Sequence, residues 1–151
     1  MPISILDSIP GVYKAFNRTQ CVVGEIVAND PTMINKMTEA AQIPSYTSIS
    51  NLLSPEEYHQ ADSALQAVAK LNLSALERLK PAMISNIYVM SLYNTVYPKE
   101  NQDWQLDSFF FFFSEKKQIP IVGLESIDKQ IDLLFNSQSL ERQSFLLVGA
   151  V

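Results

Sequence analysis

Two glutamates of this sequence, Glu25 and Glu125, follow apolar runs and could do chemistry as a pair. Glu125 stands where the β-branched residues Ile121 and Val122 give way to a helix-like pattern, and open α/β sheets place their ligands at such a point. Glu25 lies within the apolar run of residues 20–28, where burying an unpaired carboxylate is costly, so it lies at an exposed strand end or in a site. Two carboxylates can hold a divalent cation through their oxygens or act as general acid and base.

The residues around Glu125 predict a strand, a tight turn and a helix. Gly123 lets the backbone turn, and Ser126 can cap the helix that follows. If residues 20–28 form a second strand parallel to this one, both glutamates lie at one edge of a sheet. Apolar residues of the helix recur at helical spacing, at Ile127, Ile131 and Leu134.

Helices are predicted for most of the remaining chain. Ser54-Pro55-Glu56-Glu57 is a capping box with proline at the first helical position, and its helix runs to about Leu71. Ser74-Ala75-Leu76-Glu77 is a second box, before a short helix. The helix of residues 81–96 is apolar on nearly every side, so it is buried or covered by a partner. Further helices are predicted for residues 10–16, 31–42, 108–117 and 140–151, and residues 2–9 are expected to form a loop or a short strand.

Five consecutive phenylalanines, Phe109 to Phe113, follow Asp107, which can cap a helix at that point. Such a block is too long and too apolar to lie half-exposed, and periodicity alone leaves a strand possible. The aspartate cap and the polar ending Ser114–Lys117 favour a helix. The phenylalanines either pack in the core or form a subunit contact or a ligand wall.

Composition narrows the classes of function. A chain of 151 residues has the length of one domain, and 47% hydrophobic with 18% charged residues is typical of a globular protein. The formal net charge of -5 and the absence of a basic run make nucleic acid an unfavourable partner. No apolar run approaches the length of a membrane span, and no secretory signal is visible, so the compartment is unknown.

The lone cysteine and the lone histidine offer little chemistry. Cys21 has no second cysteine to pair with, which excludes an intrachain disulfide and a Cys-based zinc site, and we expect a buried structural thiol. His59 is expected on the solvated side of a helix. Glu56 and Asp62 lie three residues to either side of it, which leaves weak metal binding open.

The segment I-V-G-L-E-S-x-x-x-Q-I, residues 121–131, resembles the hallmark segment of the TraB/GumN-like family, relatives of the Tiki-type metalloproteases. Other segments resemble the same family in the same order: Leu52–Tyr58, Leu76–Pro81 and Leu106-Asp107 with its Phe-rich helix. The matching segments extend over residues 20 to 135. The resemblance implies the middle portion of a metal-dependent hydrolase or peptidase domain.

In this family, the proposed active site is built from G-x-x-H motifs and glutamates. No G-x-x-H motif occurs in the present sequence, and the residues that match are Glu25, in V-V-G-E-I, and Glu125, in G-L-E-S. The resemblance makes both of them candidate catalytic and metal-binding residues, with Gln130 as a supporting residue. A complete family member would hold a divalent metal such as zinc, manganese or cobalt. The resemblance also implies that residues 1–151 form a single domain that is truncated at both ends.

The predicted fold is therefore α/β with helix dominating, in which six or seven helices flank a small, mainly parallel sheet. Two functions remain open. The chain is either a member or fragment of a metal-dependent hydrolase family without independent activity, or a non-catalytic binding and assembly module. Exposed sheet edges recruit other chains, and the apolar helices could pack in a homo-oligomer. A cation near Glu25 and Glu125 would favour the first function, and a large apolar self-interface without metal the second.

Overall fold

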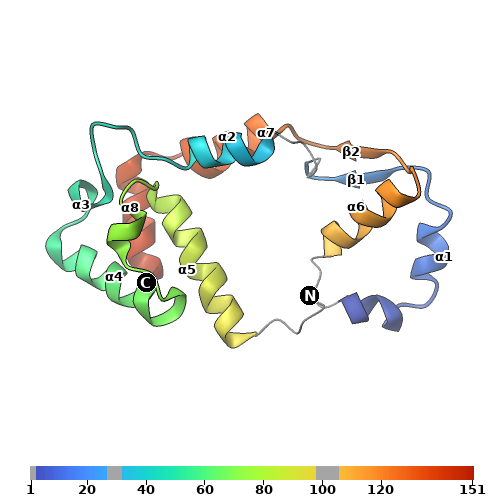
Figure 1. The fold of residues 1–151 in the computed structure, drawn as a ribbon, viewed down its shortest axis with the longest axis horizontal. Coiled ribbons are helices and arrows are strands. Elements are labelled where there is room, and N and C mark those ends of the chain that lie inside the picture. Colours follow the sequence, from blue (N-terminus) through green and yellow to red (C-terminus); the bar gives the residue numbers. More distant parts are fainter. Residues whose placement is uncertain (1–2, 27–31, 98–105) are drawn as a thin grey trace. The chain divides into compact units, whose positions relative to one another are not determined.

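A computed structural model describes residues 3–26, 32–97 and 106–151 of the chain (Figure 1). These residues form eight α-helices and a two-stranded parallel sheet, which confirms the predicted helix-dominated α/β fold. Residues 27–31, where one predicted element ends and the next begins, lie outside the described part. The chain divides into two compact units, unit 1 with residues 1–33 and 99–129, and unit 2 with residues 34–98 and 130–151. The single domain expected from the sequence stays a prediction.

Unit 1 contains the sheet. Residues 2–9 were expected to form a loop or a strand, but most of them form a 3₁₀ helix, in which the Ile9 N–H donates to the Leu6 carbonyl at 3.1 Å. The first strand is shorter than the predicted run, because the chain bends at Glu25 and Ile26. The elements of unit 1 are the 3₁₀ helix η1 (Ile3–Ser8), α1 (Val12–Phe16), β1 (Val22–Gly24), α6 (Leu106–Lys116) and β2 (Ile121–Gly123).

Helix α6 confirms the predicted helix for the phenylalanine block and packs against both strands (Figure 1). All five phenylalanines, Phe109–Phe113, are partly exposed, so the prediction that this block could not lie half-exposed is wrong for unit 1 by itself. The reason is geometric: successive side chains point in different directions around a helix, and only some of them can face the sheet. The Phe110 ring meets the edge of Phe16 from α1, with the ring centroids 5.2 Å apart.

Unit 2 is helical. Helices α4, α5 and α8 pack against one another, and their apolar side chains form the core together with residues of α3, of the loops on either side of it and of the 3₁₀ helix η2. Helices α2 and α7 cross the boundary between the units. The remaining elements are α2 (Met33–Ala40), α3 (Ile49–Leu52), α4 (Pro55–Ala69), the 3₁₀ helix η2 (Leu73–Leu76), α5 (Pro81–Val96), α7 (Ile127–Ile131), the π-helical segment η3 (Asp132–Asn136) and α8 (Leu140–Ala150). The core side chains are Ile43, Ile49, Leu53, Ala61, Leu65, Leu73, Ile84 and Leu147.

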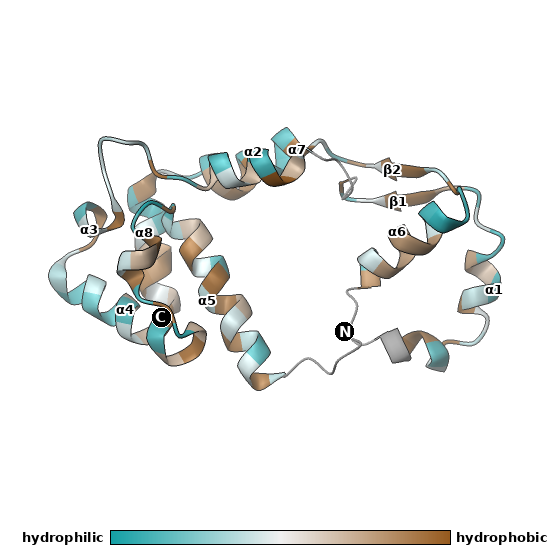
Figure 2. Ribbon diagram, in the orientation of Figure 1, coloured by the Kyte–Doolittle hydropathy of each residue, from teal (hydrophilic) through white to brown (hydrophobic). Residues whose placement is uncertain are grey.

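The predicted apolar helix of residues 81–96 is α5, and Figure 2 shows apolar residues along its whole length. Only its first turn is enclosed, by the burial of Pro81 and Ile84, whereas Tyr93 and Val96 near its end are exposed. No helix in the described ranges is long and apolar enough to cross a membrane.

One of the two predicted capping boxes is confirmed. The Ser54 N–H donates to Glu57 Oε2 at 2.8 Å, and the Glu57 N–H donates to Ser54 Oγ at 3.3 Å. The second box, from Ser74 to Glu77, is wrong, because Glu77 Oε1 accepts from the Ser50 N–H at 3.0 Å. The carboxylate that was expected to cap its own helix instead holds the first turn of α3, 27 residues away.

The pKa of Glu77 gives a test of its contact with α3. Burial by itself would raise the pKa, but hydrogen bonds from Ser50, Ser48 and Tyr58 outweigh it and lower the pKa from the usual 4.5. Because the folded pKa is the lower one, the carboxylate stabilises the fold above the unfolded pKa, and this contribution is lost as pH falls through the folded pKa. We therefore expect Glu77→Gln to be less stable than the wild type at pH 7, and the difference to shrink below pH 4.5.

Urea unfolding curves at a series of pH values between neutral and acidic conditions measure this difference. Ser50→Ala removes one hydroxyl donor but keeps the carboxylate, so it should reduce the pH dependence without abolishing it. A Glu77→Gln penalty that stays constant with pH would contradict the assigned pairing.

The helix predicted after Ser126 departs from α-helical geometry in its last turn. Residues Asp132–Asn136 form a π-helical segment, which places Phe135 in the core with 2% of its surface exposed. Leu134, which shares the helical spacing of Ile127 and Ile131, is 43% exposed. The start of the next helix is as predicted, because Ser139 Oγ accepts from the Arg142 N–H at 3.3 Å.

Candidate functional site

The backbones of Glu25 and Glu125 meet at the carboxyl end of the parallel pair. Beyond the last paired residues of β1 and β2, the Leu124 N–H donates to the Gly24 carbonyl at 2.9 Å. One residue further, the Glu125 N–H donates to the Glu25 carbonyl at 2.8 Å. The prediction that both glutamates lie at one edge of a parallel sheet is therefore confirmed for their backbones. This is the edge where parallel sheets bind ligands.

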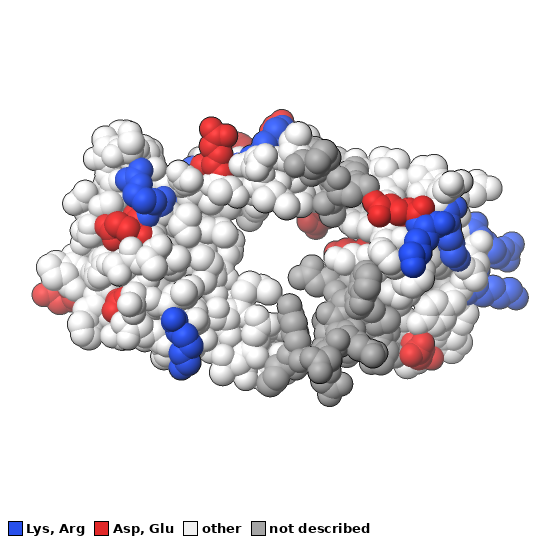
Figure 3. Space-filling view, in the orientation of Figure 1, with Lys and Arg blue, Asp and Glu red and all other residues white. Residues whose placement is uncertain are grey.

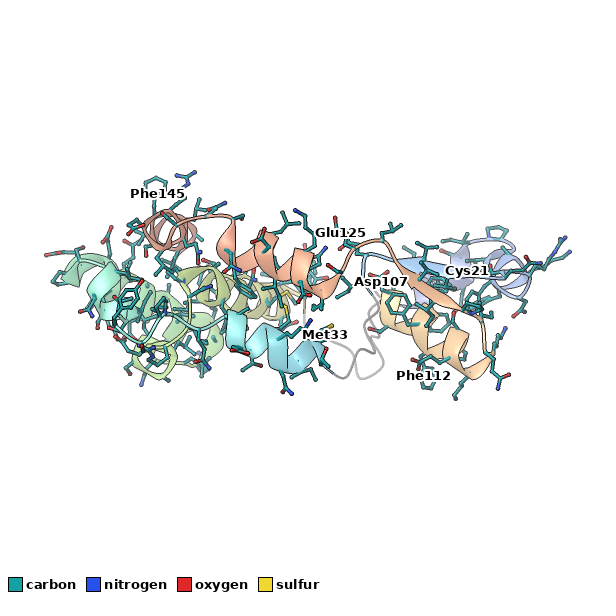
Figure 4. The ribbon with its side chains drawn as sticks, turned by 90° about the horizontal axis from the view of Figure 1, so that it is seen from above. Cys21, Met33, Asp107, Phe112, Glu125 and Phe145 are labelled. Atoms are coloured by element: carbon teal, nitrogen blue, oxygen red, sulfur yellow. The ribbon has the colours of Figure 1, made fainter. Side chains whose placement is uncertain are left out.

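A pocket lies at this edge of the sheet, and it has an acidic side chain that the predicted pair did not include. Continuing the strand register by one residue sets Glu25 opposite Leu124, so Glu125 is offset by one position. Both Glu25 and Leu124 line a pocket of about 450 Å³, and Glu125 is not among the described residues that line it. Figure 4 shows Glu125 where β2 leads towards α7.

The acidic partner of Glu25 in this pocket is Asp107. It lies in the first turn of α6 rather than ahead of the helix, so its predicted role as a cap is wrong (Figure 4). A carboxylate in the first turn is favoured by the partial positive charge of the helix N-terminus. Phe111 follows one turn later and lines the same pocket, so α6 presents an acidic and an aromatic residue on one face. The four-residue spacing of Asp107 and Phe111, which puts both on one face of a helix, is the sequence pattern that could have pointed to Asp107 as a site residue.

Gly24 lets this helix approach the strand. A Cβ atom on Gly24 would lie closer to Cζ of Phe111 than any van der Waals contact allows. The strand β1 can therefore pack this closely against the Phe111 ring only because residue 24 has no side chain.

We expect Gly24→Ala to lower the free energy of unfolding by about 1–3 kcal/mol, the usual cost of overpacking. Adding Phe111→Leu, which shortens the opposing side chain, should recover part of this loss. Gly149→Ala is the matched control, because a Cβ on Gly149 meets nothing within 4 Å and alanine favours its helix. Urea denaturation of the three variants measures the effect, and a Gly24→Ala variant as stable as Gly149→Ala would contradict the close approach.

The predicted metal site is incomplete in the described residues. These residues contain no group of three or more His, Cys, Asp and Glu side chains that could hold a metal ion. His59 is exposed on α4 as predicted, and its Nδ1 lies 3.4 Å from Ser63 Oγ. Carboxylates without imidazole or thiolate partners suit hard cations such as Mn²⁺ or Mg²⁺ better than Zn²⁺. The described side chains do not make a zinc centre, and no catalytic step through a metal follows from them.

The sequence also singled out Ser126, Gln130 and Cys21. Ser126 caps α7 as predicted, since its Oγ accepts from the Lys129 N–H at 3.2 Å. Gln130 lies in the last turn of α7 and is partly buried, and its supporting role stays a prediction. The expected burial of Cys21 is wrong, because Cys21 precedes β1 and is exposed.

The geometry defines a helix-dominated α/β protein with a glutamate shortly after the end of each of its two parallel strands. The chain belongs to the TraB/PrgY/gumN family, whose family model matches residues 2–151. This match confirms the resemblance found in the I-V-G-L-E-S segment and its companions. Comparisons with curated proteins and with solved structures found no significant match.

Proposed function

We propose that the carboxyl end of β1 and β2 is the acidic part of a metal-dependent hydrolase or peptidase site, and that this chain does not hydrolyse substrates by itself. The observation that carries the proposal is that Glu25 and Asp107 line one pocket, with the Glu125 N–H hydrogen-bonded to the Glu25 carbonyl. Family membership supports the reaction class.

The chemistry assigned to these residues is modest. Carboxylate oxygens can ligate a hard divalent cation, and a carboxylate next to a polarised water can accept its proton. Phe111 and Leu124 line the same pocket beside these carboxylates. In a full hydrolase site, imidazole ligands complete the coordination, and this sequence has no histidine besides His59.

Titration with Mn²⁺ tests the proposed site. We expect one bound ion per chain, followed by the electron paramagnetic resonance signal of free Mn²⁺. Glu25→Gln and Asp107→Asn should each weaken binding by about tenfold or more, the usual effect of disturbing a metal site. Glu125→Gln reports whether the third carboxylate also contributes.

Glu56→Gln is the matched control, because Glu56 lies in the first turn of another helix, α4, and is exposed. It should bind Mn²⁺ like the wild type. Absence of binding, or equal weakening by the control, would overturn the proposed site. Peptide turnover by this chain with added zinc, manganese or cobalt that disappears in Glu25→Gln would instead overturn the proposed lack of independent activity.

The second candidate function is self-assembly, and exposed apolar residues on α5 favour it. This helix contains no charged residue, and Figure 3 shows the surface over it without Lys, Arg, Asp or Glu atoms on the face drawn. Met90, Tyr93 and Val96 are among its exposed apolar side chains. If these residues form a homo-oligomer contact, sedimentation velocity will show a species larger than a monomer, and Tyr93→Lys will dissociate it. A monomer at all concentrations would exclude this function.

A further inference from the structure

We draw no further inference here: the strongest candidate, the pocket between the end of β1 and the start of α6 that Glu25, Asp107 and Phe111 line, belongs to the site already described, and apart from its two carboxylates nothing in the described ranges indicates what it binds.

Discussion

Replacing Leu147 by alanine is expected to lower the free energy of unfolding by about 2–5 kcal/mol, the range found for buried leucines. Leu147 lies in α8 with none of its surface exposed and belongs to the core cluster that also contains Leu65 of α4 and Ile84 of α5. Truncation to alanine removes the apolar contacts and leaves a cavity that three packed helices cannot easily close. Urea denaturation of the whole chain, followed by far-ultraviolet circular dichroism, measures the loss.

The neighbouring residue provides the control. Leu146 has the same side chain on the same helix but is 42% exposed, so Leu146→Ala should cost about 1 kcal/mol or less. The comparison holds helix propensity constant and changes only burial. Equal losses in the two variants would contradict the orientation of α8 on α4 and α5.

Replacing Gln143 by leucine is the second substitution with a large expected effect. This amide is buried, with 3% of its surface exposed, and it bonds three backbone groups. Its Nε2 donates to the carbonyls of Phe135 at 3.1 Å and Gln138 at 2.9 Å, and its Oε1 accepts from the Ala82 N–H at 3.3 Å. Gln143 therefore joins the start of α5, the π-helical segment and the loop before α8.

Leucine fills a similar volume but satisfies none of these groups. The Phe135 carbonyl keeps a second donor, Lys80 Nζ, at 3.3 Å. Two backbone groups, the Ala82 N–H and the Gln138 carbonyl, lose the Gln143 amide, at about 1–3 kcal/mol for each group that is left unsatisfied. Urea denaturation measures the total loss, and hydrogen exchange should become faster at the Ala82 amide.

Gln66→Leu is the matched control for Gln143→Leu. Gln66 is exposed on α4 and makes one side-chain hydrogen bond, from its Nε2 to Asp62 Oδ2 at 2.7 Å. Because water can replace that bond, the change should be nearly neutral. If Gln143→Leu were as mild as this control and left exchange at Ala82 unchanged, the three-way contact of Gln143 would be refuted.

Features that depend on a few neighbouring residues were predictable from the sequence. The capping box from Ser54 to Glu57 is complete within one turn, so its pattern identifies it. The same pattern failed from Ser74 to Glu77, because Ser50, far away in the sequence, offers Glu77 a better set of donors. Local motifs specify local hydrogen bonds only when no distant group competes for them.

In the candidate site, too, local features could be predicted from the sequence, whereas contacts between distant residues could not. The two glutamates follow apolar strands, and parallel pairing alone brings their backbones together. Asp107 enters the pocket only because α6 packs on β1 at Gly24, a tertiary contact that periodicity does not specify. The one-residue offset of Glu125 depends on the strand register, which turn and packing geometry fix rather than composition.

The most direct test of the proposed site locates a bound cation on the chain. In a two-dimensional nuclear magnetic resonance spectrum of the isotope-labelled protein, Mn²⁺ at a low molar ratio broadens amide signals close to the ion. The account predicts selective broadening at Gly24 to Ile26, Asp107-Ser108 and Leu124-Glu125, the residues at the carboxyl end of the sheet and the start of α6. Broadening centred on the acidic first turn of α4, or no selective broadening, would contradict it.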